Sequence, residues 1–326
     1  MTMKQFLTII ASLLAAVFAT AQEKVTVSII DGIYEDNVKI AIETNLSNLL
    51  TEVNSAVSEH RSLSFKGFPI SRNAQESMSM LWSNVPFLCE DKEILERLIT
   101  TSDGYQVRNI PISLCPEGAS VSDDLYQEAV VDFDKSGEIQ SFYFGLSNLL
   151  WKQVMKGEDV GDLRRRQQIL DYVEHFRTAY NQKDISFLDQ VFSDDALIIT
   201  GKVIKTKPSD FNPMPQDKIV YNMRTKKEYL SKLKNIFSVT KYVKVSFSEI
   251  RITRHPTKPD FYGVLLRQGY SSDIYSDDGY LFLLWDFRDE SLPQIHVRTW
   301  QPYYLDNEKT KVISDDEIFD ISSFDF

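Results

Sequence analysis

The pattern of apolar and polar positions changes period several times along the first half of the chain. Residues 23–30 alternate polar and apolar side chains and predict a short strand. Apolar positions three to four residues apart then predict three helices, over residues 37–60, 74–82 and 92–99. Alternation returns later and predicts three strands, over residues 105–114, 125–133 and 138–146. The turn sequence DKSG joins the last two, so we expect them to form a hairpin.

The second half begins with a long amphipathic helix over residues 163–182. Ile169, Val173, Phe176 and Tyr180 lie at i, i+4, i+7 and i+11, so they share one apolar face. A short helix over residues 183–192 follows, and Asp184 can cap its start. A third helix, over residues 225–237, can be capped by Thr225 in the same way.

Six strands accompany these helices. The pattern places them at residues 196–204, 218–223, 242–252, 261–270, 280–287 and 294–300. In the third of them the apolar phase shifts by one residue between Phe247 and Ile250, which predicts a bulge that curls the sheet. The segment LFLLW is apolar on both faces, so we expect its strand to be central and covered on both sides.

Element order and two segments, YVEHFRTAYNQKDISFLDQVFSDDALIITGK and LWDFRDESLPQIHVRTW, resemble the nuclear transport factor 2-like superfamily over about residues 163–302. That superfamily includes SnoaL-type cyclases, ketosteroid isomerase and scytalone dehydratase. The resemblance implies a cone-shaped α+β domain in which a curled antiparallel sheet wraps around a long helix.

The first half is not assigned to a family. Its segment VVDFDKSGEIQSFYF reads like LLWDFRDESLPQIHVRTW, which raises the hypothesis of a divergent second copy of the helix-on-sheet plan. An unrelated α+β arrangement explains the same pattern. The expected fold is therefore a helix-plus-antiparallel-sheet domain at residues 22–156, the cone at 163–302 and an acidic, aromatic tail at 303–326. The polar segment KGEDVGD, residues 156–162, is the expected boundary.

Residues 1–21 have the pattern of a secretory signal peptide, with Lys4, an apolar run and a small-x-small end at Ala19–Ala21. We expect cleavage after Ala21 and a soluble protein in the periplasm, outside the cell or at its surface, without stable membrane insertion. The formal net charge of −11 argues against nucleic acid as a partner. In an oxidising compartment Cys89 and Cys115 can form a disulfide or remain two separate thiols.

Motifs for other chemistries are missing. The four histidines are scattered, with no HxH, HExxH or CxxC, so we expect no metal, and no cofactor-binding motif occurs. The resemblance directs attention to the cone. Residues expected to line it are Tyr172, Tyr180, Tyr221, Arg267, Trp285, Arg298 and Trp300. The catalytic candidates are Asp195, Asp286, His296 and Tyr180.

Each candidate also has an ordinary structural explanation. Tyr180 ends an apolar helix face, Asp286 starts a hairpin turn, and His296 alternates with two apolar residues. Asp194 and Asp195 precede a strand, where adjacent side chains point to opposite faces, so at most one of them can enter a pocket.

Three functions remain open. The first, which we favour, is an exported non-catalytic module that binds an apolar small molecule or a protein, with homodimerisation through the sheet face as one arrangement. The second is an isomerase, dehydratase or cyclase with a carboxylate base in the cone. The third is a structural component of the cell envelope. The aromatic tail can dock on an apolar groove of its own protein or of a partner, or it can fray.

Overall fold

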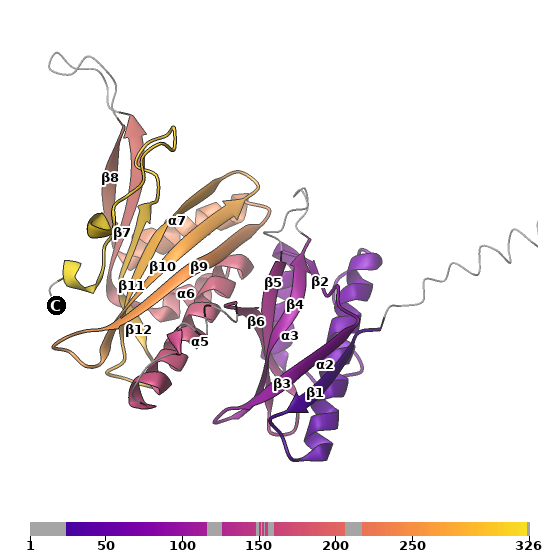
Figure 1. Cartoon of the computed structure of the whole chain (residues 1–326). Helices are drawn as coiled ribbons and strands as arrows, with labels where there is room; N and C mark the ends of the chain where they lie inside the picture. The colour runs from indigo at the N-terminus through magenta and orange to yellow at the C-terminus, as the bar shows by residue number, and fades with distance from the viewer. Residues whose placement is uncertain are drawn as a thin grey trace, which may run out of the picture.

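The computed structural model describes residues 24–115, 126–147, 150, 152, 154–155, 160–205 and 217–324. The expected signal peptide and the expected domain boundary lie outside these residues, apart from the backbone of residues 160–162. Within them the fold is α+β with two six-stranded sheets, each of which contains one parallel pair (Figure 1). The expected fold class is confirmed.

The N-terminal half places two helices on one face of its sheet. Its helices are α2 (Asp36–Ser58) and α3 (Arg72–Asn84). Its strands are β1 (Thr26–Asp31), β2 (Phe87–Leu88), β3 (Glu93–Thr100), β4 (Gly104–Leu114), β5 (Tyr126–Asp134) and β6 (Ile139–Gly145). The sheet order is β1-β3-β4-β5-β6, with β2 paired to β4. The apolar side of α2, around Leu46, Leu50 and Val53, is fully buried against this sheet.

One predicted helix is wrong. Residues 92–99 form most of strand β3, which pairs with β1 and β4. Ile94 and Leu98 are buried, whereas Glu93, Leu95 and Arg97 are exposed. Because a spacing of four residues fits both a helix face and a strand face, these two apolar positions alone could not separate the two structures.

The C-terminal half is a curled sheet around a long helix. Its helices are α5 (Val160–Gln182), α6 (Ile185–Val191) and α7 (Lys226–Val239). Its strands are β7 (Phe192–Lys205), β8 (Asp217–Arg224), β9 (Val243–Arg254), β10 (Phe261–Ser272), β11 (Ser276–Asp286) and β12 (Gln294–Pro302), in the order β8-β7-β12-β11-β10-β9.

Local sequence signals account for several of these elements. The side chain of Asp184 caps α6, and Thr225 with Glu228 forms a capping box at α7. The predicted bulge lies in β9, where the register shifts between the partners Glu249 and Phe247. Strand β11 is central and is covered on both faces, as expected.

The two halves share the helix-on-sheet plan but differ in topology. In the N-terminal half the first strand, β1, runs parallel to β3, which is the first strand of the antiparallel run. In the C-terminal half the parallel partner of β7 is β12, the last strand of that run. A divergent copy would therefore have to differ in strand connectivity as well as in sequence.

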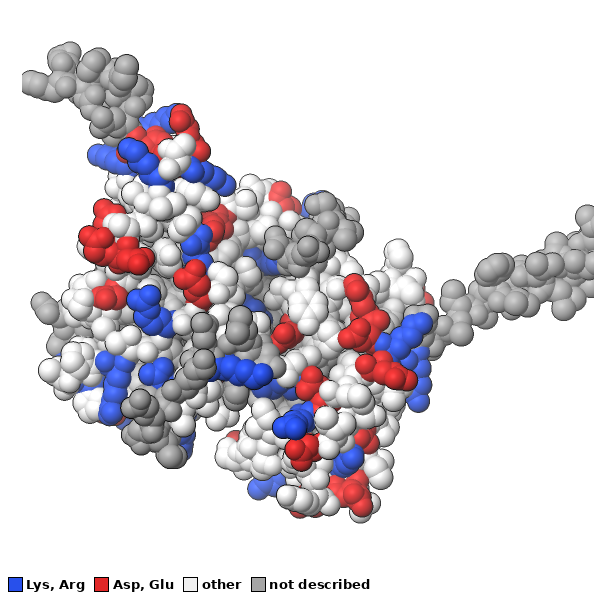
Figure 2. Space-filling view, in the orientation of Figure 1, with Lys and Arg blue, Asp and Glu red and all other residues white. Residues whose placement is uncertain are grey.

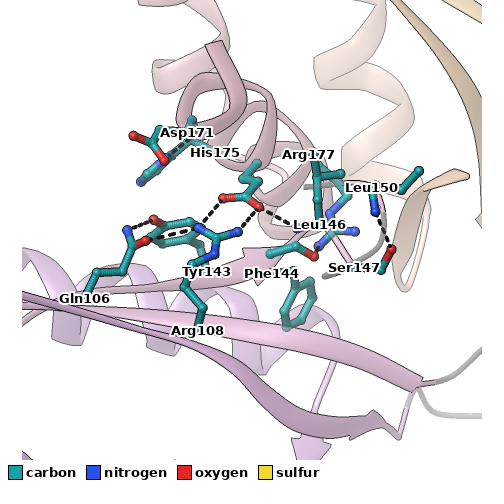
Figure 3. A network of polar contacts seen from close by, with 12 residues as sticks. Gln106, Arg108, Tyr143, Phe144, Leu146, Ser147, Leu150, Asp171, His175 and Arg177 are labelled. Atoms are coloured by element: carbon teal, nitrogen blue, oxygen red, sulfur yellow. Dashed lines mark hydrogen bonds and ion pairs between the residues drawn. The ribbon is translucent and has the colours of Figure 1, made fainter. Parts of the chain in front are cut away.

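Helix α5 lies between the two sheets and contacts both β6 and β9 (Figure 1). Its polar side chains bind backbone groups at the end of β6, the outermost strand of the N-terminal sheet (Figure 3). Thr178 accepts a bond from the amide of Phe144 at 3.1 Å, and Arg177 donates to the carbonyl of Gly145 at 2.6 Å. Edge strands need such cover, because their free backbone groups are otherwise unpaired.

A buried ion pair fixes the same contact. Glu174 is fully buried and binds Arg108 of β4 through both carboxylate oxygens, at 2.5 and 3.2 Å (Figure 3). It also accepts the amide of Leu146 at 2.6 Å. Gln106 links Arg108 to the buried hydroxyl of Tyr143. The N-terminal sheet and the central helix of the cone are thus joined by a hydrogen-bonded polar network.

Removing one partner of this pair should destabilise the whole chain. In Arg108→Met, Glu174 keeps its charge in a buried site without its cation, so we expect a loss of about 3–5 kcal/mol in the free energy of unfolding. Urea unfolding measures this, with the exposed Arg97→Met as the matched control. The double variant Arg108→Met/Glu174→Leu should recover most of the loss; a double variant as unstable as the single one would contradict the explanation.

The carboxyl of Asp171 makes this contact depend on pH. Burial, together with the nearby charge of Glu174, raises the pKa of Asp171 to about 7. The folded protein therefore holds this proton up to a higher pH than the unfolded chain does. The stability that the protonated Asp171 carboxyl contributes is complete below about pH 4 and is lost as the pH rises through 7.

We therefore expect Asp171→Asn to be more stable than the wild type at pH 8, by about 1–2 kcal/mol once partial exposure is allowed for. At pH 5 the two proteins should differ by less than half of that amount. Chemical unfolding of both at the two pH values tests this. An equal difference at pH 5 and pH 8 would show that Asp171 does not titrate in this range.

Candidate functional site

The inner face of the cone contains a buried polar cluster built from three elements. Tyr180, at the end of the apolar face of α5, forms a hydrogen bond with the hydroxyl of Tyr229 on α7. Arg298 reaches the same place from β12, and its guanidinium lies 4.9 Å from the centre of the Tyr229 ring. The predicted helix face and the predicted strand therefore meet at one point, although 118 residues separate Tyr180 from Arg298 in the chain.

Arg298 is the unusual member of this cluster. Its side chain is 5% exposed, and its Nε and Nη1 have no hydrogen-bond partner among the described residues. Burial opposes its charge, but Tyr229, Tyr180 and Asp277 together raise its pKa, so the guanidinium stays protonated. A buried cation with free donors is costly, because each donor has lost its bonds to water.

Sequence reasoning missed one carboxylate of this cluster, Asp277 on β11. It alternates with the inward-facing Leu281 and Leu283, and it lies within electrostatic reach of Arg298. One of its oxygens accepts the hydroxyl of Tyr275 at 2.8 Å, and the other is buried without a partner in the described part of the chain. Burial raises the pKa of Asp277 to about 6. In the sequence, SDIYSDDGY reads as a hairpin turn, so only the inward alternation of Asp277 could have indicated this residue.

Aromatic side chains fill much of the surrounding cone. Tyr172 packs at 5.1 Å from the fully buried Trp285. Trp300 is 9% exposed, and its indole nitrogen has no partner among the described residues. At Gly279 a β-carbon would lie 2.1 Å from the carbonyl oxygen of Gln301 and 2.9 Å from the Trp300 ring, so only glycine fits there. Of the expected lining residues, Tyr172, Tyr180, Trp285, Arg298 and Trp300 therefore belong to the inner side.

Tyr221 and Arg267 are placed differently from the expectation. The ring of Tyr221 contacts Phe319 of the tail, and its hydroxyl accepts a bond from Gln301 at 2.9 Å. Arg267 forms a two-pronged ion pair with Asp278 and stacks 3.4 Å from the ring centre of Tyr303. Both side chains lie on the outer face, because the β-strand alternation puts their positions opposite the inward-facing ones.

Three of the four catalytic candidates also gather away from the cone. The Nε2 of His296 lies 3.1 Å from Asp286, and its Nδ1 lies 3.5 Å from Asp195. Asp286 is further bound by Arg288, and Asp195 accepts the hydroxyl of Ser193. His296 is thus paired with two carboxylates, but their position makes them an ion cluster that joins β7, β11 and β12.

This ion cluster is poorly suited to proton abstraction. The hydroxyl of Ser193 lowers the pKa of Asp195; burial alone would raise that of Asp286, but its bonds with Arg288 lower it. Both ring nitrogens of His296 face carboxylates, so neither is left for a substrate. Asp195 itself is largely exposed, and Asp194 binds Lys226 at 2.9 Å instead, so the two aspartates point to different neighbours as expected.

The two cysteines do not form a bridge. Cys89 is buried and Cys115 is partly exposed, and both are free thiols. Phe87 pairs with Leu114 in the antiparallel contact of β2 and β4, so the chains carry Cys89 and Cys115 away from each other on either side of that pair. Burial raises the pKa of Cys89 to about 11, which makes this thiol unreactive.

Three other features concern metal sites, membrane helices and surface charge in the described residues. No group of three histidine, cysteine, aspartate or glutamate side chains there is arranged to hold a metal ion. None of the described helices combines the length and the apolar character needed to cross a membrane. On the face shown in Figure 2, acidic and basic side chains are interspersed rather than gathered into a basic band.

Comparison with known proteins adds a likeness in fold. No protein-family model matches the sequence, and no curated protein is similar to it. Among solved structures, the chain is similar to Bd1075 of Bdellovibrio bacteriovorus, with 21% identity and a TM-score of 0.34. This match covers 46% of the chain and 44% of the Bdellovibrio protein, so the chain spans less than half the length of that protein.

Two other similar structures are named for their fold. An NTF2-like protein of Cytophaga hutchinsonii matches 42% of the chain over 98% of its own length, at 15% identity and a TM-score of 0.32. An NTF2-like protein of unknown function in nutrient uptake from Rhodospirillum rubrum matches 41% of the chain over 97% of its own length, at 13% identity and a TM-score of 0.32. At these identities the likeness concerns fold and not activity. NTF2-like proteins are thus among the solved structures that the chain resembles, as the sequence resemblance implied.

Proposed function

We propose that the C-terminal domain is the non-catalytic binding module of an exported protein, and that its cone holds a small ligand with an acidic oxygen. The observation that carries this is Arg298. Its charge is buried beside Tyr180 and Tyr229, and two of its nitrogens lack a partner within the described residues. An anionic oxygen of a ligand would satisfy those donors and the charge together.

The surroundings of Arg298 set the chemistry of the rest of the ligand. The inside of the cone is lined by aliphatic and aromatic side chains, among them Leu283 and Trp285 on β11 and Phe237 on α7. Such a surface favours an apolar body next to the acidic group. The ligand class is therefore a small aromatic or aliphatic acid, which refines the apolar small molecule considered from sequence.

A fluorescent aromatic sulfonate, 8-anilinonaphthalene-1-sulfonate, can test this without knowledge of the natural ligand. We expect saturable binding that carboxylic acids with apolar bodies displace. Arg298→Met should weaken the affinity about 10- to 100-fold, because a hydrogen bond to a charged group contributes about 1.5–3 kcal/mol. The matched control is Arg97→Met, an exposed arginine of the other domain. Equal affinity in Arg298→Met and wild type would rule out this site.

An enzyme with a base in the cone is the second candidate, and Asp277 is the observation that favours it. With its pKa near 6, its carboxyl is mostly ionised at neutral pH, and Tyr180 and Arg298 are donors nearby. A proton-abstracting enzyme needs that combination. Non-catalytic binding is preferred because the other carboxylate candidates, Asp195 and Asp286, belong to the outer ion cluster.

Turnover separates the two candidates. A binding module should leave a β,γ-unsaturated ketone unchanged at any protein concentration, as followed by the absorbance of the conjugated product. If the wild type isomerises the ketone and Asp277→Asn lowers the rate at least 100-fold while still binding the sulfonate, the enzyme becomes the correct assignment. Asp278→Asn, a neighbouring carboxylate on the outer face, is the control.

Export is a separate part of the proposal and rests on residues 1–21. A chain expressed from its own start codon in a Gram-negative host should appear in the periplasmic or extracellular fraction. Amino-terminal sequencing should begin at Gln22. An intact Met1 in the cytoplasmic fraction would contradict export.

A further inference from the structure

The C-terminal tail lies on the outer face of the cone's sheet, the face opposite Arg298. Two short 3-10 turns, η2 (Asp315–Glu317) and η3 (Ile321–Ser323), follow the last strand. Ile321 is buried, and with Phe324 it packs against an apolar patch of the sheet. This patch, called the outer patch below, consists of Leu197, Phe261, Leu265, Phe282, Leu284 and Val297.

Individual tail residues fit particular positions of the outer patch, and these positions together are called the seat of the tail. The ring of Phe324 stacks on Phe282 at 5.7 Å with an interplanar angle of 8°. Ile321 lies over Gly263, where a β-carbon would be 3.1 Å from that of Ile321. The same β-carbon would lie 2.8 Å from the Phe282 ring, so a larger residue at position 263 would push against both Phe282 and the tail.

Polar contacts set the register of the tail on this seat. The side chain of Gln301 accepts the amide of Phe319 at 2.6 Å and donates to the carbonyl of Glu317 at 2.9 Å. Gln301 is 1% exposed, so both of its bonds to the tail are shielded from water. These two buried hydrogen bonds hold the backbone of the tail in one register on the sheet.

Charged side chains of the tail also face charged side chains of the sheet. The tail carries Asp315, Asp316, Glu317 and Asp320, and the facing strands β9 and β10 carry Arg251, Glu249 and Arg267, of which Arg267 is paired with Asp278. Asp315, Asp320, Glu249 and both arginines line one crevice of about 380 Å³. The apolar contacts of Ile321 and Phe324 thus define the match, and Arg251 adds a positive charge beside the acidic tail.

The tail contacts the sheet through side chains and turns, without a β-ladder of its own. After the isolated bridge between Tyr304 and Val312, the described tail contains only 3-10 turns and loops. Few side chains therefore anchor it, and it can leave its seat without breaking a strand. We propose that the outer patch is a docking surface for an acidic peptide segment with apolar anchors, and that the tail is its intramolecular occupant.

A protein partner that carries such a segment would bind after displacing the tail. The tail then acts as a competitor at high local concentration, as a tethered ligand does. It also covers part of the sheet face that was considered from sequence for a homodimer.

The test uses full-length protein and a labelled synthetic peptide of residues 313–326. In Ile321→Asp the tail should leave its seat, because a carboxylate cannot stay buried against Phe282 and Gly263. Fluorescence anisotropy should then show binding of the peptide, at least tenfold tighter than to the wild type. Val312→Asp, an equal change at an exposed tail position, is the matched control and should behave like the wild type.

Two further arms test the specificity of the surface. Peptides with Ile321→Asp or Phe324→Ala should bind the Ile321→Asp protein at least tenfold more weakly than the wild-type peptide, whereas Asp316→Asn should keep most of the affinity. Raising the salt from 20 to 500 mM should weaken binding several-fold, because the complementary charges are exposed.

Ile321→Asp must keep the circular dichroism spectrum of the wild type, and the milder Phe319→Ala/Phe324→Ala protein serves if it does not. The proposal is overturned if the folded variant binds the peptide no better than the wild type, or if peptides without the anchors bind equally well. A variant that dimerises in light scattering and excludes the peptide would also overturn it, because the face would then bind a second copy directly.

Discussion

The buried carboxylate of Glu174 is the constraint on which the arrangement of the chain depends. It sits in the middle of α5, on the side opposite the apolar face that fills the cone. A charge there is tolerated only because Arg108 and the amide of Leu146 saturate its oxygens. Both donors come from the N-terminal half, so the central helix of the cone can be buried only when that half is in place. Helix α5 therefore packs against both sheets.

This dual role explains the unusual composition of α5. One face carries Val173, Phe176 and Tyr180, and the other carries Glu174, Arg177 and Thr178. A surface helix would leave the second set in water, but here the second set binds the end of an edge strand. Since Tyr180 is also part of the polar cluster in the cone, the contact between the halves and the candidate site share one rigid element. A change at the contact therefore has a direct physical route to the site.

Much of the fold could be predicted from the local sequence pattern, because most helices and strands are specified by residues that lie close together in the chain. The caps at Asp184 and Thr225, the bulge near Phe247 and the doubly apolar strand β11 are all signalled within a few residues. Strand β3 shows the limit: its two buried residues are four apart, and the pairing that decides its structure comes from distant strands. The site was predictable only in part for the same reason. The inward positions of Tyr180 and Arg298 can be predicted from the helix face and the strand alternation. The position of their partner Tyr229 depends on how α7 crosses the sheet.

Of the three buried arginines among the described residues, Arg108 and Arg298 differ most in how their charge is matched. Arg108 is 6% exposed and has its charge matched by Glu174, so its burial is explained by the fold alone. Arg298 is equally buried, yet its neighbours among the described residues leave two of its nitrogens without partners. The carboxylate of Asp277, which interacts with Arg298 electrostatically, has a pKa raised to about 6, so it compensates the charge of Arg298 incompletely as the pH falls below about 6. A buried donor without a hydrogen-bond partner lowers the stability of the fold, and among the described residues no other contact of Arg298 replaces the missing hydrogen bonds. In the proposed function a ligand supplies the missing partner, and Arg298, rather than the well-paired histidine on the outer side, is the group that binds it.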